Sequence, residues 1–388
     1  MKIKVKPEDF VVEELIDVPF TKKGPYTVLK LTKWAWNTLD VIDFISRKLH
    51  VSAKRFSRAG LKDRYSQTTQ YLSFRGNFQQ TIKEKNFTVT PVATSTQPVS
   101  FASMKGNRFS ITLRYLIHTD ISRIQKNYQE IIHYGIPNYF DEQRFGSAKH
   151  GQGFFAKKLM LGHYKGALQL ILATPFKEDS QQEKQFKHFC REHWGQWTEC
   201  LNRAPPSYQR MVRVLTRNRR DLKGAIKTIS REMLNLHILA YQSFIFNESL
   251  KKYVTDCGSN TVTMPYSLGS FIFYRKLVDV DTSSQCTIPM VSEKAPLRGE
   301  VGSLIKSVLD KEGLTIRDFS LRAMRFRGVR FKPFTRNALF FPQGFTCGKP
   351  ANDDLYAKKK KMKIAFTLPP GSYATLLIKR LMLKSSMH

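Results

Sequence analysis

The chain carries, near its N-terminal end, the stretch Arg58-Ala59-Gly60-Leu61-Lys62-Asp63-Arg64-Tyr65-Ser66-Gln67-Thr68-Thr69-Gln70, in which one carboxylate, Asp63, stands between two cations. A short helical pattern begins upstream at Ser52, and Gly60 is expected to end it. Residues 68–74 alternate and are β-prone, which predicts a strand. Asp63 is therefore expected on a tight loop between a helix and a strand, where catalytic side chains are common.

Charge decides what Asp63 can do on such a loop. The neighbouring cations Lys62 and Arg64 favour the charged form of a carboxylate, so Asp63 is expected to be ionised at neutral pH. A solvated turn with no chemical task explains the same three residues and is the commoner case. The stretch alone leaves both interpretations open.

The composition predicts a globular protein with a polyanionic partner. Lys and Arg number 64 against 31 acidic residues, a net charge of +33 over 388 residues, while 41% of residues are hydrophobic. Such a field attracts RNA, DNA or an anionic membrane. No apolar run is long enough to span a bilayer, and the N-terminus lacks the apolar core of a signal peptide. We therefore expect an intracellular nucleic-acid protein located in the cytoplasm.

Hydrophobic periodicity predicts mixed secondary structure along the chain. One helix is expected with Asn37 or Thr38 as its cap, and a second with Asp120 as its cap and Gly135 at its end. A helical region is expected from about 156 to 250. Further strands are expected over 26–31, 107–114, 325–332 and 364–368, with a last helix after residue 372. The segment 136–146 is aromatic, amidic and charged at once, and it is expected to form a loop or an irregular strand.

The segment between Arg203 and Arg231 holds nine basic residues and one acid, Asp221. Steps of three and four residues place its basic side chains roughly on one helical face. That face is either simply solvated or in contact with RNA phosphates. The residues that we single out for phosphate contact are Arg210, Arg213, Arg217 and Arg220.

Cofactor and metal motifs are missing from the sequence. It contains no P-loop, no GxSxG, no HExxH and no complete GxGxxG, and its five cysteines form no CxxC. We expect no cofactor and no metal. A cofactor-free activity on a polyanion, or binding alone, remains possible at this point.

Several sequence blocks resemble the TruD family of pseudouridine synthases, in family order from the first residues to about residue 376. The blocks are Lys4 with Pro7-Glu8-Asp9-Phe10, Ala59–Arg64, Asn107-Arg108-Phe109, Pro137–Phe140 with Gln143–Gly146, Tyr241–Phe244 with Asn247, and Leu368-Pro369 with Gly371–Thr375. The resemblance thus covers nearly the whole chain.

This resemblance implies an α+β fold. A pseudouridine-synthase catalytic domain, with a mixed, mainly antiparallel sheet, would comprise residues 1–155 and 319–388. An inserted α/β TRUD domain would occupy residues 156–318 and interrupt it. The blocks matched in the insertion are looser than those in the catalytic part.

The resemblance also implies a reaction. Family members isomerise uridine to pseudouridine in tRNA, typically at position 13, without cofactor or metal. Asp63 matches the catalytic aspartate, and Lys4 matches the basic residue that pairs with it. A monomeric enzyme with tRNA as partner is expected.

Four further residues are implied to contact the substrate. Phe140 matches the aromatic residue that stacks on the flipped base, and Asn138 matches an amide at the site. Glu14 and Tyr373 lie in matching blocks. The chain is more basic than these blocks require, so a synthase that accepts other RNA stem-loops besides tRNA is a further alternative. A non-catalytic basic RNA-binding or RNA-chaperone protein on the same fold is the alternative, although Asp63, Lys4 and Phe140 are all present.

Overall fold

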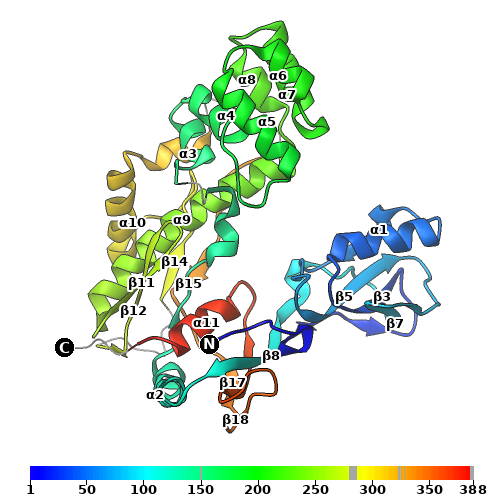
Figure 1. Ribbon diagram of the computed structural model, residues 1–388, viewed down its shortest axis with the longest axis vertical. Helices are drawn as coiled ribbons and strands as arrows, with labels where there is room; N and C mark the ends of the chain where they lie inside the picture. The colour runs from blue at the N-terminus through cyan, green and yellow to red at the C-terminus, as the bar shows by residue number, and fades with distance from the viewer. Residues whose placement is uncertain (149–150, 279–285, 322–323, 325, 327, 385–388) are drawn as a thin grey trace. The chain divides into compact units, whose positions relative to one another are not determined.

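The computed structural model describes residues 1–148, 151–278, 286–321, 324, 326 and 328–384 (Figure 1). The chain divides into two compact units. Unit 1 comprises Met1–Ile136 and Phe340–His388, and unit 2 comprises Pro137–Leu339. The chain therefore leaves unit 1 once and returns to complete it. These limits differ from the domain boundaries expected after residues 155 and 318, and the domain assignment itself stays a prediction.

Unit 1 is built on an 11-stranded sheet with the main order β17-β19-β8-β1-β5-β3-β7-β2, to which β18, β4 and β6 attach. β1 and β5 pair in parallel, whereas the other described pairs are antiparallel, so the sheet is mixed as expected. The strands are β1 Phe10–Ile16, β2 Phe20–Thr21, β3 Tyr26–Lys33, β4 Phe56–Arg58, β5 Gln67–Arg75, β6 Ile82–Glu84, β7 Phe87–Ser95, β8 Met104–Leu116, β17 Gln343–Cys347, β18 Ala351–Asn352 and β19 Lys360–Leu368.

Helices cover this sheet because apolar side chains on strand and helix share a core. Leu31 of β3 and Ile45 of α1 are fully buried in one such cluster. Elsewhere in unit 1, the side-chain amide of Asn127 on α2 donates to the carbonyls of Leu381 and Leu383 at the end of α11. The helices of unit 1 are α1 Thr38–Lys48, α2 His118–Tyr134 and α11 Ala374–Leu381, with short 3-10 turns η1 Pro7–Asp9, η2 Ala53–Arg55 and η3 Phe101–Ser103.

Unit 2 is organised around a 27-residue helix, α9. Tyr241 and Ile245 on α9 are fully buried, so this helix contributes to the core of unit 2. The described strands of unit 2 form only two-stranded sheets, so the unit is mainly helical rather than the expected α/β arrangement. Its elements are η4 Glu142–Ala148, α3 Phe155–Met160, α4 Tyr164–Leu172, α5 Gln181–Glu192, α6 Trp197–Arg203, α7 Pro206–Arg217, α8 Leu222–Lys227, α9 Arg231–Cys257, β10 Gly258–Ser259, β11 Val262–Tyr266, β12 Gly269–Phe273, β13 Lys276–Leu277, β14 Thr287–Pro289, α10 Gly299–Glu312, η5 Ile316–Ser320 and β15 Thr335–Asn337. Two short strands, β9 Ile136–Pro137 and β16 Leu339–Phe340, lie where the chain passes from one unit to the other.

Two expected elements are wrong. The helical pattern after Ser52 ends at Arg55, and β4 follows before Gly60 is reached. The Arg55 guanidinium donates to the carbonyl of Arg75 on β5, which draws this segment onto the sheet. The strand expected over 325–332 is absent from residues 326 and 328–332, because the chain turns at Gly328 (φ 73°), whose carbonyl accepts from Arg231. Arg325 and Arg327 lie outside the described residues.

The helix ends show how local signals act. Gly135 ends α2 with φ 70°, as expected, because a residue without a Cβ adopts this conformation freely. Asp120 is not the cap of α2 but its third residue, and its carboxylate accepts the backbone N–H of Ile117 instead. The helix α10 was not expected at all, since Gly, Pro and Ser around it favour loops.

Candidate active site

Asp63 lies on the loop between β4 and β5 and forms an ion pair with Lys4 from the N-terminal segment. The Lys4 Nζ lies 2.5 Å from Asp63 Oδ2, and the backbone N–H of Tyr65 donates to Oδ1 at 2.9 Å. The two side chains keep 21% and 27% of their surfaces exposed, so a substrate can reach the carboxylate. The structure thus brings together two residues that are 59 positions apart.

The surroundings of Asp63 keep it ionised. Burial by itself raises the pKa of a carboxyl group, but here it is outweighed. The hydrogen bonds from Lys4 and the Tyr65 N–H, with the charges of Lys4 and Lys33, hold the pKa of Asp63 below its ordinary value. Asp63 is therefore a carboxylate ion throughout the neutral range, which is the form needed for a nucleophile or a base.

Lys33 lies at the site but was not predicted from the sequence. Its side chain is fully buried beneath the Asp63 loop, where Nζ donates to the carbonyls of Trp36 at 2.9 Å and of Lys62 and Asp63 at 3.3 Å. Burial lowers the pKa of Lys33 to about 8, against an opposing contribution from Asp63. A signal existed, because Lys33 continues the inward-facing alternation of Leu29 and Leu31 along β3.

Glu14 has an internal partner in unit 1. Its side chain is completely buried and lies 2.5 Å from the Nζ of Lys62, while its other oxygen accepts the backbone N–H of Tyr71 at 3.0 Å. This pair draws Lys62 away from the Asp63 carboxylate. Glu14 therefore anchors the residue next to Asp63, and its expected contact with substrate stays a prediction.

Asn138 and Phe140 belong to unit 2, where they form one braced loop. The Asn138 amide oxygen accepts from Arg336 at 2.6 Å, and its nitrogen donates to the carbonyl of Asn337. The side chain of Asn247 on α9 pairs with both the N–H and the carbonyl of Phe140, at 2.8 and 2.9 Å. These bonds fix the backbone on which the Phe140 ring is carried.

Two guanidinium groups lie close to the Phe140 ring. Arg336 is 4.2 Å and Arg144 is 5.4 Å from the ring centroid, and the residue is only 4% exposed. The Nε of Arg144 is buried and has no hydrogen-bond partner among the residues that the structure describes. Arg144 stands in the Gln143–Gly146 block, but its charge so close to an aromatic ring was not foreseen.

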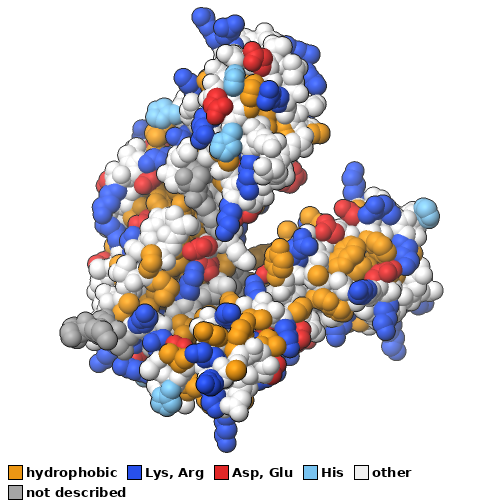
Figure 2. Space-filling view, viewed as in Figure 1, with side chains coloured by type: hydrophobic (Ala, Val, Ile, Leu, Met, Phe, Trp, Pro, Cys, Tyr) orange, Lys and Arg blue, Asp and Glu red, His pale blue; other side chains and the backbone are white. Residues whose placement is uncertain are grey.

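The remaining predicted residues are Tyr373 in unit 1 and four arginines in unit 2. Tyr373 is the N-cap of α11, where its carbonyl accepts the N–H of Leu376 at 3.1 Å. The four predicted phosphate contacts are all exposed: Arg210, Arg213 and Arg217 on α7, and Arg220 just beyond it. Figure 2 shows Lys and Arg side chains projecting from the end of unit 2 that carries α6 to α8.

These arginines are set apart from the core of their helix. Met211, Val212 and Leu215 occupy its buried face, so the helix is amphipathic with a cationic outer side. Within the described chain, none of the four arginines has an acidic partner. Phosphate contact and simple solvation are both compatible with this exposure.

Known proteins resemble the chain over nearly its full length. The family model described as tRNA pseudouridine synthase D (TruD) matches residues 1–265 and 275–381. A Methanococcus maripaludis protein named "Probable tRNA pseudouridine synthase D 1" is 32% identical, over 98% of this chain and 99% of its own. A Leptospira interrogans tRNA pseudouridine synthase D is 30% identical, over 99% and 96%.

A solved structure shares the fold. The TruD structure from Methanosarcina mazei superimposes with a TM-score of 0.73 at 25% identity, covering 98% of this chain and 93% of that one. The matches point to an RNA-modifying isomerase of the pseudouridine synthase class. More narrowly, the chain belongs to the tRNA pseudouridine synthase D (TruD) family. No helix in the described part of the chain combines the length and apolar character needed to cross a membrane.

Proposed function

We propose that this enzyme isomerises uridine to pseudouridine at position 13 of tRNA, with Asp63 as the reactive carboxylate and without a cofactor. The observation that carries the proposal is the Lys4–Asp63 pair at 2.5 Å in a chain of the TruD family. We assign unit 1 as the pseudouridine-synthase catalytic part, since it holds this pair, and unit 2 as the inserted TRUD domain.

The reaction requires little beyond a positioned carboxylate ion. The bond between N1 of uracil and C1′ of the ribose breaks, a bond between C5 and C1′ forms, the C5 proton is lost, and N1 gains a proton. Atoms and electrons balance with no oxidant or reductant. Asp63 can add covalently to the substrate or accept a proton, and both roles need the ionised form that Lys4 stabilises.

Phe140 supplies a flat ring against which the extruded uracil stacks, an interaction of roughly 1–3 kcal/mol per base. Because the ring is buried under guanidinium groups, stacking requires one of them to move. Arg144 is the one to move, since Arg336 is tied to Asn138 by hydrogen bonds. Asn138 then orients the loop and Tyr373 completes the substrate surroundings, while Glu14, which is completely buried, acts by anchoring Lys62.

The exposed arginines of unit 2 hold the body of the tRNA through its phosphates. Arg210, Arg213 and Arg217 project from the outer side of α7, and a net charge of +33 favours such contacts. This role is independent of the chemistry at Asp63. Removing these arginines therefore weakens binding rather than the chemical step.

The proposal is tested by mapping pseudouridine at single-nucleotide resolution in a tRNA transcript treated with the enzyme. The wild-type enzyme converts position 13, Asp63→Asn converts nothing, and both bind the transcript with similar affinity. Asp17→Asn is the matched control, because Asp17 is an exposed acid of unit 1 that pairs with Lys105. Full activity of Asp63→Asn would falsify the assignment.

Two other outcomes separate the alternatives. Conversion at other stem-loops but not at position 13 would indicate a broader RNA range. Tight binding with no conversion in any RNA, by the wild-type enzyme, would favour the non-catalytic RNA-binding protein.

A further inference from the structure

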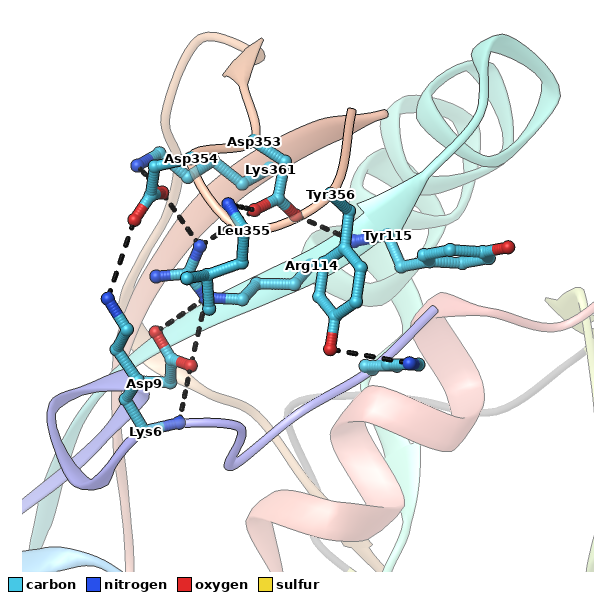
Figure 3. Close-up of polar contacts among 10 residues, drawn as sticks. Lys6, Asp9, Arg114, Tyr115, Asp353, Asp354, Leu355, Tyr356 and Lys361 are labelled. Carbon is cyan, nitrogen blue, oxygen red and sulfur yellow. Dashed lines mark hydrogen bonds and ion pairs between the residues drawn. The ribbon is translucent and has the colours of Figure 1, made fainter. Parts of the chain in front are cut away.

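A buried charge network in unit 1 centres on Arg114 of β8 (Figure 3). Its Nε lies 2.9 Å from both carboxylate oxygens of Asp9, and its Nη1 lies 2.8 Å from Asp353 and from Asp354. The second Asp353 oxygen accepts the backbone N–H of Tyr115 at 3.0 Å. One guanidinium thus joins the N-terminal turn, the sheet and the loop before β19.

Removing these charges from water costs free energy, so stability alone does not explain why the network is buried. Arg114, Asp9 and Asp353 are 5%, 1% and 8% exposed. Apolar side chains of similar volume generally stabilise a core at least as well as buried ion pairs do, and buried charges are sometimes retained because they specify one arrangement. The arrangement specified here is that of the N-terminal segment.

Arg114 holds that segment on both sides of Lys4. Its backbone N–H and carbonyl exchange hydrogen bonds with Lys2, at 2.9 and 2.8 Å, while its guanidinium binds Asp9. Asp9 in turn accepts the backbone N–H of Lys6 at 2.9 Å. Residues 3 to 8 therefore form an arch that is attached to one arginine at each end.

Lys4 stands within this arch in a conformation that must be imposed. Its φ is 56°, in the left-handed region that residues with a Cβ rarely adopt, and such backbone persists where the surroundings enforce it. This backbone directs the Nζ across the Phe10 ring, 4.4 Å from its centroid, to Asp63. A relaxed arch would not deliver the ammonium group to the carboxylate.

We propose that Arg114, with Asp9 and Asp353, is a positioning network that fixes Lys4 against Asp63. The inference rests on the proposed function, because it assumes that the Lys4–Asp63 pair performs the chemistry. The Lys4–Asp63 pair then also depends on the loop that carries Asp353, which lies 239 positions after Arg114.

The test compares Asp9→Asn and Asp353→Asn with the wild-type enzyme in single-turnover assays on a tRNA transcript across pH 3 to 7, a range that extends below the ordinary pKa of an aspartate. We expect each variant to react at least ~10-fold more slowly at unchanged tRNA affinity, since small misplacements of a reacting group are costly. The acid limb of the profile of rate against pH shifts to higher pH. Asp63 loses its interaction with the Lys4 ammonium group but keeps those with Lys33 and the Tyr65 N–H. Glu13→Gln is the control, because it removes an exposed ion pair between Glu13 on β1 and Arg108 on β8, the strand that carries Arg114. This variant should leave the rate and the acid limb unchanged.

Combination with Lys4→Met separates positioning from general destabilisation. If the network acts through Lys4, Asp9→Asn causes no further loss of rate in the Lys4→Met enzyme. Multiplicative losses, or an unshifted acid limb in Asp9→Asn, would overturn the proposal. Thermal unfolding verifies that each variant is folded, and if Asp9→Asn is not, Asp353→Asn breaks the same network from the other side.

Failure of this inference is distinguishable from failure of the proposed function. An inactive Asp63→Asn together with wild-type behaviour of Asp9→Asn and Asp353→Asn overturns the positioning role alone. A fully active Asp63→Asn overturns both.

Discussion

Lys4 and Asp63 are joined by a 2.5 Å contact although one lies in the N-terminal arch and the other on the loop between β4 and β5. Neither side chain is deeply buried, so the pair is open to solvent and to substrate. This combination of a fixed ion pair and an accessible carboxylate is what separates Asp63 from an ordinary surface acid.

Lys4→Met should move the acid limb of the rate profile upward. The pKa of Asp63 is held below its ordinary value by the hydrogen bonds from Lys4 and the Tyr65 N–H, so loss of Lys4 raises this pKa. The Asp63 carboxylate also stabilises the folded protein at pH values above the pKa that it has in the unfolded chain. This contribution is lost as the pH falls through the lower pKa of the folded state. Single-turnover rates and urea unfolding between pH 3 and 7 measure both effects. Identical acid limbs in Lys4→Met and wild type would show that Lys4 does not control Asp63.

Lys33→Met should remove the alkaline limb from the profile of rate against pH. Burial lowers the pKa of Lys33 to about 8, so above that pH the amine loses its charge and one of three donors. The rate should then decline in the wild-type enzyme, and the variant should be slower at all pH values without a limb near 8. Lys30→Met is the matched control, since Lys30 is exposed on the same strand. An unchanged limb in Lys33→Met would assign it to another group.

The stability of the wild-type enzyme should also respond to Lys33. Because the folded-state pKa lies below that of the unfolded chain, the unfolded chain binds more protons between about pH 8 and 10. This residue alone therefore makes the protein more stable as pH rises through that window. Urea unfolding of wild type and Lys30→Met should show that contribution, and Lys33→Met should lack it.

Phe140→Leu should abolish most activity without unfolding the enzyme. The ring is 4% exposed, so Phe140→Ala would lose about 3–5 kcal/mol of stability and confound the assay. Leucine keeps much of the volume but offers no flat face for the uracil. Activity and thermal unfolding are measured together, with Phe20→Leu, an exposed aromatic residue, as control. A wild-type rate in Phe140→Leu would exclude stacking on this ring.

Changing Arg210, Arg213, Arg217 and Arg220 together to Ala should flatten the salt dependence of tRNA binding. Each lost phosphate contact lowers the slope of log affinity against log salt by roughly 0.7–0.9. The control is a set of four exposed lysines in unit 1: Lys22, Lys23, Lys54 and Lys83. If both sets lower the slope equally, general charge rather than this helix attracts the RNA.

Prediction from sequence succeeded where structure depends on neighbours along the chain. The strand over 68–74, the helix beginning at Thr38 and the end of α2 at Gly135 follow from alternation, capping and a left-handed glycine, all of which are local. It failed at Arg55, where a hydrogen bond to Arg75 across the sheet converts a helical pattern into a strand. Such distant partners leave no periodic signal.

The sequence by itself determined the family, the loop position of Asp63 and the cationic character of α7, because these depend on residue identity and short spacing. Only the tertiary structure decided which charges meet. It buries Lys33 beneath the loop, pairs Lys62 with Glu14, and ties the arch of Lys4 to Arg114. Burial and long-range pairing set these interactions, since both depend on which strands become neighbours in the folded sheet.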